Sequence, residues 1–543
     1  MKKIHKKLVL LSSVILLFVA ISAKSQNVDY PFVAGIFKPN WESLKNYKTP
    51  DWFRDAKFGI WAHWGPQCEP EAGDWYGRNL YIQGHKQNII HNQKYGHPSV
   101  FGFKDVIHEW KADSLNANKL VDFYKKSGAK YFVAMANHHD NFDMWNSKYQ
   151  PWNSVNMGPK KDLINEWENA ARAAGLPFGV SIHASSTWSW YEVTQMSDTS
   201  GVFKGVKYDG NLTKYDGKGK WWEGYDPQDL YAQYNHKISP DVLNRRLAWK
   251  NPGDLPNKDY LTKYYKRVLD LIQQHKPELV YFDDSVLPLK ENDEAIGLGI
   301  VASAYNSSID RNNGKNQTVI NTKSLNSEQK KCLVHDFEVG VARDIFPEPW
   351  QVDACIGGWH YKADVEYKTA DQVIRALIDV VSKNGNLLLS VPIRGNGTID
   401  AKEKKILNNI GKWLEINGEA IYGTRPWLKY GEGPSTTENV PDIAKGGLPF
   451  YRKAPYTAED IRFTTKGKLL YAIALDWPKN NRLLIQTLAK GNKEVKGLIK
   501  SIKLIGYKGN LKFSQTEKGL EVNLPAKKPC DIAYAISIEG LKL

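Results

Sequence analysis

The sequence of 543 residues lacks the signatures of several common enzyme classes. Its four cysteines, at positions 68, 332, 355 and 530, match no zinc-binding spacing, and we expect them to be buried free thiols. It contains no GxSxG motif, no HExxH motif and no phosphate-binding loop. After residue 25 no apolar run is long enough to cross a membrane. These absences argue against a serine hydrolase, a zinc protease, a nucleotide-dependent enzyme and an integral membrane protein.

Positive charge is abundant, but it is concentrated at the two ends of the chain. The formal net charge is +15. Residues 1–26 contain five lysines and no acids, and residues 421–543 contain 21 Lys and Arg against 11 Asp and Glu. The long middle segment is therefore close to neutral, whereas a nucleic-acid enzyme is expected to carry its basic excess around the active domain. We expect no nucleic-acid partner.

The first 25 residues have the order of a secretory signal peptide. Lysines within residues 1–7 precede an apolar run of about 14 residues, and small residues follow at 23–25. The run is shorter than the ~20 residues needed to span a bilayer. This pattern predicts an exported protein, periplasmic or secreted.

Residues 26–420 alternate between short apolar runs and amphipathic segments. Helical periodicity at 163–174, 261–272 and 373–381 separates several of the runs, which favours parallel strands. The candidate strands are 57–64, 131–138, 178–184, 279–284, 318–322, 333–338, 352–357 and 386–392. Eight strands with intervening helices predict an α/β fold, a (β/α)8 TIM-like barrel, with little room for full helices around the fifth to seventh strands.

After a last helix at 406–414, the periodicity changes to two. Alternating segments separated by Gly, Asn, Lys or Pro turns predict a C-terminal all-β sandwich over residues 421–543. The segment 185–259 is rich in Trp, Tyr, Gly and Asp and follows the third strand, so it is expected to be a substrate-facing insertion.

In a barrel of this kind, side chains at the carboxyl ends of the strands form the active site. The expected strand ends carry imidazoles and carboxylates: His63, His138, His139, His183, Asp283, Asp284, Asp336, Glu338 and Asp353. A metal site could use His63, His138, His139 and Asp283, although adjacent strand residues alternate in direction. Glycoside hydrolysis needs two carboxylates, with His and Trp to grip the sugar, and fits this inventory better.

Three motifs carry a resemblance to a known family. They are KFGI at 57–60 running into HWG at 63–65, GAKY at 128–131 running into HHDNF at 138–142, and NGEAIYGTRPW at 417–427. Together they resemble the α-L-fucosidases, family 29 of the glycoside hydrolases. The resemblance covers the chain from about residue 40 to its end and implies a barrel followed by a β-sandwich.

The resemblance also implies roles for individual residues. The family is retaining, and by position Asp283 matches its nucleophile. Strand alternation predicts that only one of Asp283 and Asp284 points inward. His63, His138 and His139 match the family's histidine ligands of the sugar. Asp74 and Trp75 lie where the family has Glu-Trp, and Trp359 matches an aromatic residue of an SWGY motif.

At the acid/base position the chain departs from the family, because Gln351 occupies the place of a glutamate that many family members carry. Glu338 is our first candidate, followed by Asp353, which is otherwise assigned to substrate binding. His183 and Lys323 replace residues of the family's YYS and Asn-x-Arg motifs, and His183 is assigned to substrate binding.

We therefore expect an exo-glycoside hydrolase that removes terminal α-L-fucose from oligosaccharides or polysaccharides by double displacement. The alternatives are an α-L-galactosidase and a catalytically silent sugar-binding protein. No metal and no cofactor are expected, and the partner is a fucosylated or related L-sugar-containing glycan.

Overall fold

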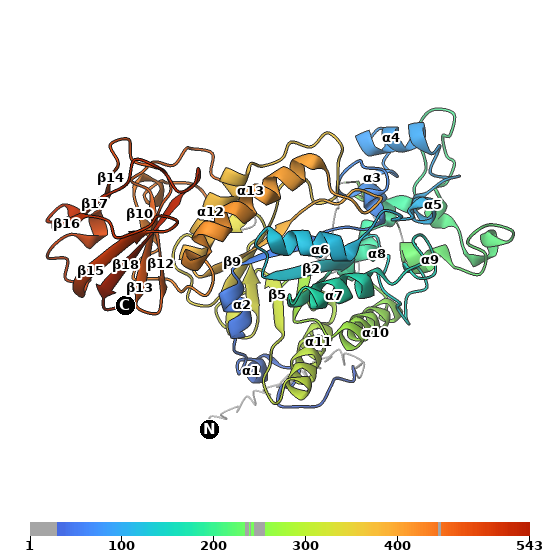
Figure 1. The fold of residues 1–543 in the computed structure, drawn as a ribbon. Helices are drawn as coiled ribbons and strands as arrows, with labels where there is room; N and C mark the ends of the chain where they lie inside the picture. Colours follow the sequence, from blue (N-terminus) through green and yellow to red (C-terminus); the bar gives the residue numbers. More distant parts are fainter. Residues whose placement is uncertain (1–29, 234–237, 239–240, 244–255, 444–446) are drawn as a thin grey trace, which may run out of the picture.

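The computed structural model describes residues 30–233, 238, 241–243, 256–443 and 447–543. A barrel forms the larger part, and a separate β domain lies at one side of it (Figure 1). The predicted signal peptide, residues 1–25, lies outside the described residues. No helix within the described ranges is long and apolar enough to cross a membrane.

The predicted barrel is confirmed. Eight parallel strands close in the order β1-β2-β3-β4-β5-β6-β8-β9. Most of their residues are buried, as expected of strands covered by helices outside and packed side chains inside. The strands are β1 (Phe58–Ala62), β2 (Tyr131–Asn137), β3 (Phe178–Ile182), β4 (Leu279–Ser285), β5 (Val319–Lys323), β6 (Val334–Asp336), β8 (Trp350–Cys355) and β9 (Gly385–Ser390).

The barrel helices begin and end at residues that suit helix termini. Asp162 accepts a hydrogen bond from a backbone N–H at the start of α7, and Gly175 follows that helix with a left-handed φ of 69°. Thr369 and Asp400 form capping boxes at α12 and α13. The major helices are α6 (Ala117–Lys126), α7 (Leu163–Ala173), α10 (Lys258–His275), α11 (Lys290–Arg311), α12 (Ala370–Ser382) and α13 (Ala401–Asn417).

One quarter of the barrel is irregular, as the close spacing of its strands predicts. Only a 3-10 turn, Gln329–Lys331, separates β5 from β6 among the helices described there. Between β6 and β8 the chain forms a short strand, β7 (Gly340–Val341), which lies outside the barrel and pairs with β11 (Leu448–Pro449).

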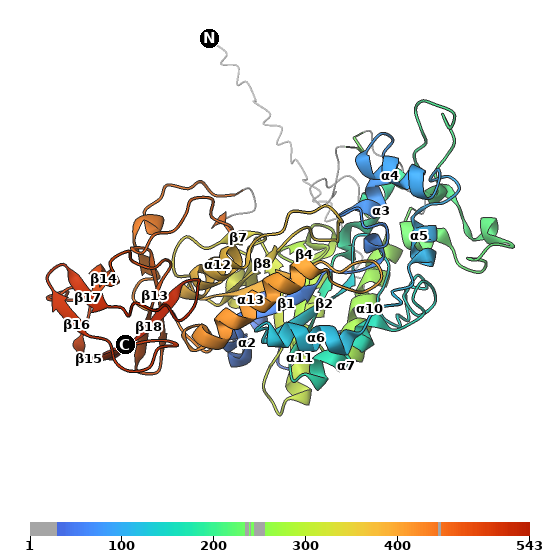
Figure 2. The same ribbon diagram turned by 45° about the horizontal axis from the view of Figure 1, so that its top comes forward.

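The loops at one end of the barrel carry the extra structure. They include α3 (Tyr76–Asn79), α4 (Lys86–Lys94), α5 (Phe103–Glu109), α8 (Thr187–Trp190) and α9 (Pro227–Tyr231). Figures 1 and 2 show α3, α4 and α5 on the side of the molecule away from the C-terminal domain. The segments before the barrel contain α1 (Trp41–Leu44) and α2 (Asp51–Ala56).

The C-terminal domain consists of two antiparallel sheets around a second hydrophobic core. One sheet has the order β10 (Gly431–Glu432), β12 (Ile461–Lys466), β13 (Leu469–Ala474), β18 (Tyr534–Leu541) and β15 (Gly497–Leu504). The other has the order β14 (Arg482–Ile485), β17 (Gly519–Asn523) and β16 (Phe513–Thr516). Strand β12 packs against α12 of the barrel, so the domain is fixed to a helix.

Candidate active site

A cavity of about 1010 Å³ lies at the carboxyl ends of the barrel strands. This volume is at the upper end of the ~300–1,000 Å³ usual for ligand pockets. Every residue to which the sequence analysis gave a catalytic or substrate-binding role lines it: His63, Asp74, Trp75, His138, His139, His183, Asp283, Glu338, Asp353 and Trp359. The rule that active-site residues lie at the carboxyl ends of the strands, called here the strand-end rule, therefore predicts correctly that these residues lie close together.

Lys323 joins two carboxylates at this cavity. It is the last residue of β5, and its Nζ contacts Asp283 Oδ1 and Glu338 Oε2, the latter at 2.5 Å. Because one ammonium nitrogen touches both groups, their nearest oxygens lie within the ~5–5.5 Å that separates the two carboxyl groups of retaining glycosidases. Asp283 and Glu338 are thus close enough to act on one anomeric carbon.

Asp283 is held in its ionised form. Burial alone would raise its pKa, but the Lys323 ammonium and the hydrogen bond from His183 outweigh burial and hold the pKa well below the usual range. The same ion pair raises the pKa of Lys323. An ionised carboxylate at the end of β4 is the state that a nucleophile requires.

Two imidazoles face the second oxygen of Asp283. His183 Nδ1 lies 3.1 Å from Asp283 Oδ2, and His139 Nε2 lies 3.6 Å from the same oxygen. His139 Nδ1 donates to the carbonyl of His183 at 2.7 Å. Burial lowers the pKa of His139 to about 4, so at neutral pH its Nε2 carries a lone pair. This nitrogen can accept a hydrogen bond from a hydroxyl in the cavity.

His138 presents a hydrogen-bond donor to the cavity, whereas His139 presents an acceptor. The amide nitrogen of Gln67 donates to His138 Nδ1 at 2.9 Å, and the Gln67 carbonyl oxygen accepts from the backbone N–H of Gly77, which sets the orientation of the amide. Burial, reinforced by neighbouring imidazoles, lowers the pKa of His138 well below its usual value, so the ring is neutral. Its hydrogen is therefore on Nε2, where it serves as a donor. His138 and His139 together offer a sugar hydroxyl one donor and one acceptor.

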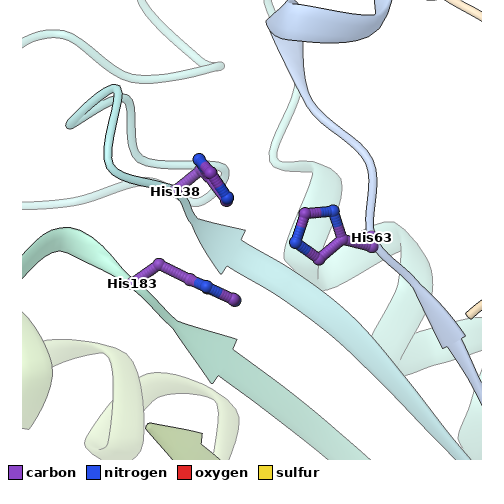
Figure 3. A group of neighbouring side chains, drawn as sticks. All are labelled: His63, His138 and His183. Carbon is purple, nitrogen blue, oxygen red and sulfur yellow. The ribbon is translucent and has the colours of Figure 1, made fainter. Parts of the chain in front are cut away.

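Three histidines of neighbouring strands face a common space (Figure 3). Nitrogens of His63, His138 and His183 lie within 4.8 Å of one another, as in many metal sites. A histidine that binds a metal normally donates its other N–H to a carboxylate or carbonyl. His138 instead accepts from Gln67 at that nitrogen. This pattern suits hydrogen bonding to a polyhydroxylated ligand better than metal binding.

Asp74 is held by a histidine that the sequence analysis did not single out. His360 Nδ1 donates to Asp74 Oδ1 at 2.5 Å, and the His360 side chain is completely buried. The His360 ring also packs edge-on against His63 and His138, with centroids 4.6 and 4.9 Å away. His360 thus supports both the carboxylate and the imidazoles of the cavity.

Asp353 belongs to a pair of buried acids. Its carboxyl group shares a hydrogen bond with Asp336 and accepts another from the Tyr281 hydroxyl at 3.3 Å. A hydrogen bond between two carboxyl groups requires one shared proton. Gln351 donates to Asp336 at 2.8 Å and does not line the cavity. A side chain at position 351 therefore supports the acid pair rather than facing a substrate.

The prediction that only one of Asp283 and Asp284 points inward is wrong, since both line the cavity. The pairing of β4 with β5 shifts register between Tyr281 and Ser285, so the alternation breaks down there. Asp284 accepts a hydrogen bond from Ser185, and burial raises its pKa to about 7. His138 and His139 both reach the cavity because they follow the last residue of β2.

Aromatic rings complete the wall. Trp61 and Trp359 lie 5.6 Å apart between ring centroids, and Trp75 lies 5.8 Å from His139. Trp75 has a φ of 62°, which is uncommon for a non-glycine residue and typical of functional sites. Residues of the wall that the sequence analysis did not single out include Trp61 and Tyr281, and Gln67 and His360 lie behind the wall. Lys323 was named only as a departure from the family motif, although the strand-end rule could have placed it in the cavity.

Comparisons with known proteins agree with this geometry. Residues 25–419 match the family model described as "Alpha-L-fucosidase", and residues 454–539 match the one described as "Alpha-L-fucosidase C-terminal domain". The chain is 27% identical over 526 residues to the plasma alpha-L-fucosidase of Homo sapiens, covering 93% of each protein. It is 25% identical to an alpha-L-fucosidase of Branchiostoma floridae, covering 93% of this chain and 96% of that protein. The crystal structure of the Thermotoga maritima alpha-fucosidase in complex with fucose is 25% identical, with a TM-score of 0.66 over 92% of this chain and 100% of that one.

Proposed function

Because the chain belongs to the alpha-L-fucosidase family of glycosidases, we propose that it removes terminal α-L-fucose from oligosaccharides or polysaccharides with retention of configuration. The observation that carries this proposal is the contact of Lys323 with both Asp283 and Glu338. It supports two carboxylates at the separation that a double displacement needs.

In the first step, a carboxylate oxygen of Asp283 bonds to the anomeric carbon while the bond from that carbon to the glycosidic oxygen breaks. The electron pair stays on the leaving oxygen, which takes a proton from Glu338. The low pKa of Asp283 supports its role as the attacking group. Glu338 must be protonated at this point, so the mechanism requires its contact with Lys323 to be exchanged for one with the glycosidic oxygen.

In the second step, water attacks the same carbon and gives its proton to Glu338. The bond to Asp283 breaks, and fucose leaves with its original anomeric configuration. His138 and His139 supply the donor and the acceptor that orient sugar hydroxyls, and Trp359 and Trp61 pack against its apolar face.

The experiment that tests this proposal is release of 4-nitrophenol from the aryl α-L-fucoside. The wild-type protein is expected to release it, and Asp283→Asn is expected to lose activity by ~10⁴-fold or more. Asp284→Asn is the matched control, because its carboxyl group is adjacent and is bonded to Ser185 instead of Lys323. A larger loss in Asp284→Asn than in Asp283→Asn would contradict the assignment.

The aryl α-L-galactoside serves as a second substrate, because L-galactose differs from L-fucose by a hydroxyl at carbon 6. A fucoside rate above the galactoside rate supports the proposal. Binding of fucose in calorimetry with hydrolysis of neither substrate would identify a silent sugar-binding protein and overturn it.

We also propose that the substrate is met outside the cytoplasm, on the basis of the signal-peptide pattern in residues 1–25. N-terminal sequencing of the protein recovered from the periplasm or medium is expected to begin close to residue 26. Recovery of the full-length chain from the cytoplasm alone would contradict export.

A further inference from the structure

Ser181 and His183 form a hydrogen-bonded chain behind the nucleophile. Trp61 Nε1 donates to Ser181 Oγ at 3.2 Å, Ser181 Oγ lies 3.1 Å from His183 Nε2, and His183 Nδ1 lies 3.1 Å from Asp283 Oδ2. Trp61, Ser181 and His183 are each at most 2% exposed. Water therefore does not compete for the two hydrogen bonds of Ser181, whereas the Asp283 side chain is 22% exposed to the cavity.

The direction of this chain is set at its two ends. The indole N–H of Trp61 can only donate, and the ionised carboxylate of Asp283 can only accept. His183 must therefore carry a hydrogen on Nδ1, and in the neutral ring Nε2 is left as a lone pair. The Ser181 hydroxyl, which accepts from Trp61, has its own hydrogen available for that lone pair.

We propose that Ser181 is a positioning residue that keeps His183 in its Nδ1–H form and, through it, fixes the carboxylate of Asp283 for attack. This inference rests on the proposed function. Both ring nitrogens of His183 are occupied, so its role differs from the substrate binding that the sequence analysis assigned to it.

The geometry of Asp283 explains why this donor matters. Lys323 holds Oδ1 and His183 holds Oδ2, so the plane of the carboxylate cannot rotate freely. His139 cannot replace His183 in the neutral state, because its N–H is used on the His183 carbonyl. A fixed carboxylate reaches the anomeric carbon without losing rotational freedom during attack. When the covalent intermediate breaks down, a hydrogen-bond donor to the Asp283 oxygen that is not bonded to the sugar stabilises the carboxylate as it leaves.

The test compares Ser181→Ala with Ser181→Thr, which restores the hydroxyl. In Ser181→Ala we expect the rate of covalent labelling of Asp283 by a slow fluorinated fucosyl fluoride, and kcat, to fall by about 10- to 100-fold with little change in KM. Ser181→Thr is expected to recover most of the lost rate. A full rate in Ser181→Ala, or an equal loss in both variants, would overturn the proposal.

A second measurement does not depend on activity. Nitrogen-15 NMR of histidine-labelled wild-type protein at neutral pH, with His183→Gln used to assign the signal, is expected to show the hydrogen of His183 on Nδ1. A hydrogen on Nε2 alone would overturn the inference even if the fucoside is hydrolysed. Failure of the wild-type protein to cleave any fucoside would instead remove the proposed function and leave this measurement to decide the tautomer.

Discussion

Asp336 and Asp353 share a hydrogen bond between their carboxyl groups, and both side chains are buried at the end of the barrel that holds the cavity. Burial, and then the charge of Asp353, raises the pKa of Asp336 well above its ordinary value. Burial also raises the pKa of Asp353. The pair therefore retains one proton under conditions in which exposed aspartates have lost theirs.

This shared proton predicts a specific dependence of stability on pH. Because the folded chain binds it more tightly than the unfolded chain, its contribution is fully present below pH ~4 and is lost as pH rises through the raised pKa. Asp336→Asn keeps a hydrogen-bond donor without the titration. Between pH 5 and 8, the free energy of unfolding in urea should decline less steeply in Asp336→Asn than in wild type, by up to ~1.4 kcal/mol per pH unit. Parallel curves would refute the shared proton.

Removal of the Lys323 ammonium should shift the pH dependence of catalysis. Without it, burial dominates and the pKa of Asp283 rises, so the acid limb of kcat/KM moves to higher pH. We expect this shift in Lys323→Met, measured with the aryl fucoside from pH 3 to 8. Lys323→Arg retains the charge and serves as the control, with its acid limb near that of wild type. An unchanged limb in Lys323→Met would show that another group holds Asp283 ionised.

The roles of Glu338 and Asp353 can be separated by leaving-group dependence. The rate at which Glu338→Ala hydrolyses a fucosyl disaccharide should be ~10²–10⁴-fold below that of wild type. Because an aryl leaving group needs little protonation, the rate at which the covalent intermediate forms from the aryl fucoside should fall much less. Azide should then accelerate turnover and yield a fucosyl azide. Asp353→Ala should show no azide rescue, because Asp353 is bonded to Tyr281 and Asp336. Rescue of Asp353→Ala alone would reverse the two assignments.

The contact between the barrel and the C-terminal domain contains a buried ion pair. Asp379 on α12 accepts from Arg462 on β12 at 2.6 Å and from Lys383 at 2.7 Å. Although burial opposes it, the two cations lower the pKa of Asp379 to about 2. Asp379→Ala leaves two buried cations without their partner and is expected to cost about 3–5 kcal/mol of unfolding free energy at pH 7.

The matched control is Asp371→Ala on the same helix, because the Asp371 side chain is 44% exposed and its pair with Arg375 should contribute under about 1 kcal/mol. Because the folded pKa of Asp379 lies below the unfolded value, its contribution is present above pH ~4 and is lost as pH falls towards 2. The difference between wild type and Asp379→Ala should therefore shrink in acid. A difference that is constant down to pH 2 would contradict this origin.

Several features of the molecule follow from local pattern. Continuous apolar runs such as 131–137 predict buried parallel strands, and the stop at Gly175 marks the end of α7 within two residues. Once strands are placed, the rule that active sites form at their carboxyl ends brings His63, His138 and Asp283 to one cavity. The motif resemblance supplied the family, which the family models confirm.

The sequence by itself determined the barrel, the β domain after it and many of the side chains at the cavity, because these depend on periodicity and strand order. Only the tertiary structure decided which groups share protons and charge. Lys323 reaches both Asp283 and Glu338 because neighbouring strands curve into a closed barrel. Hydrogen-bond direction and pKa depend on distances of a few ångströms and on exclusion of water, and neither is encoded in the spacing of residues along the chain.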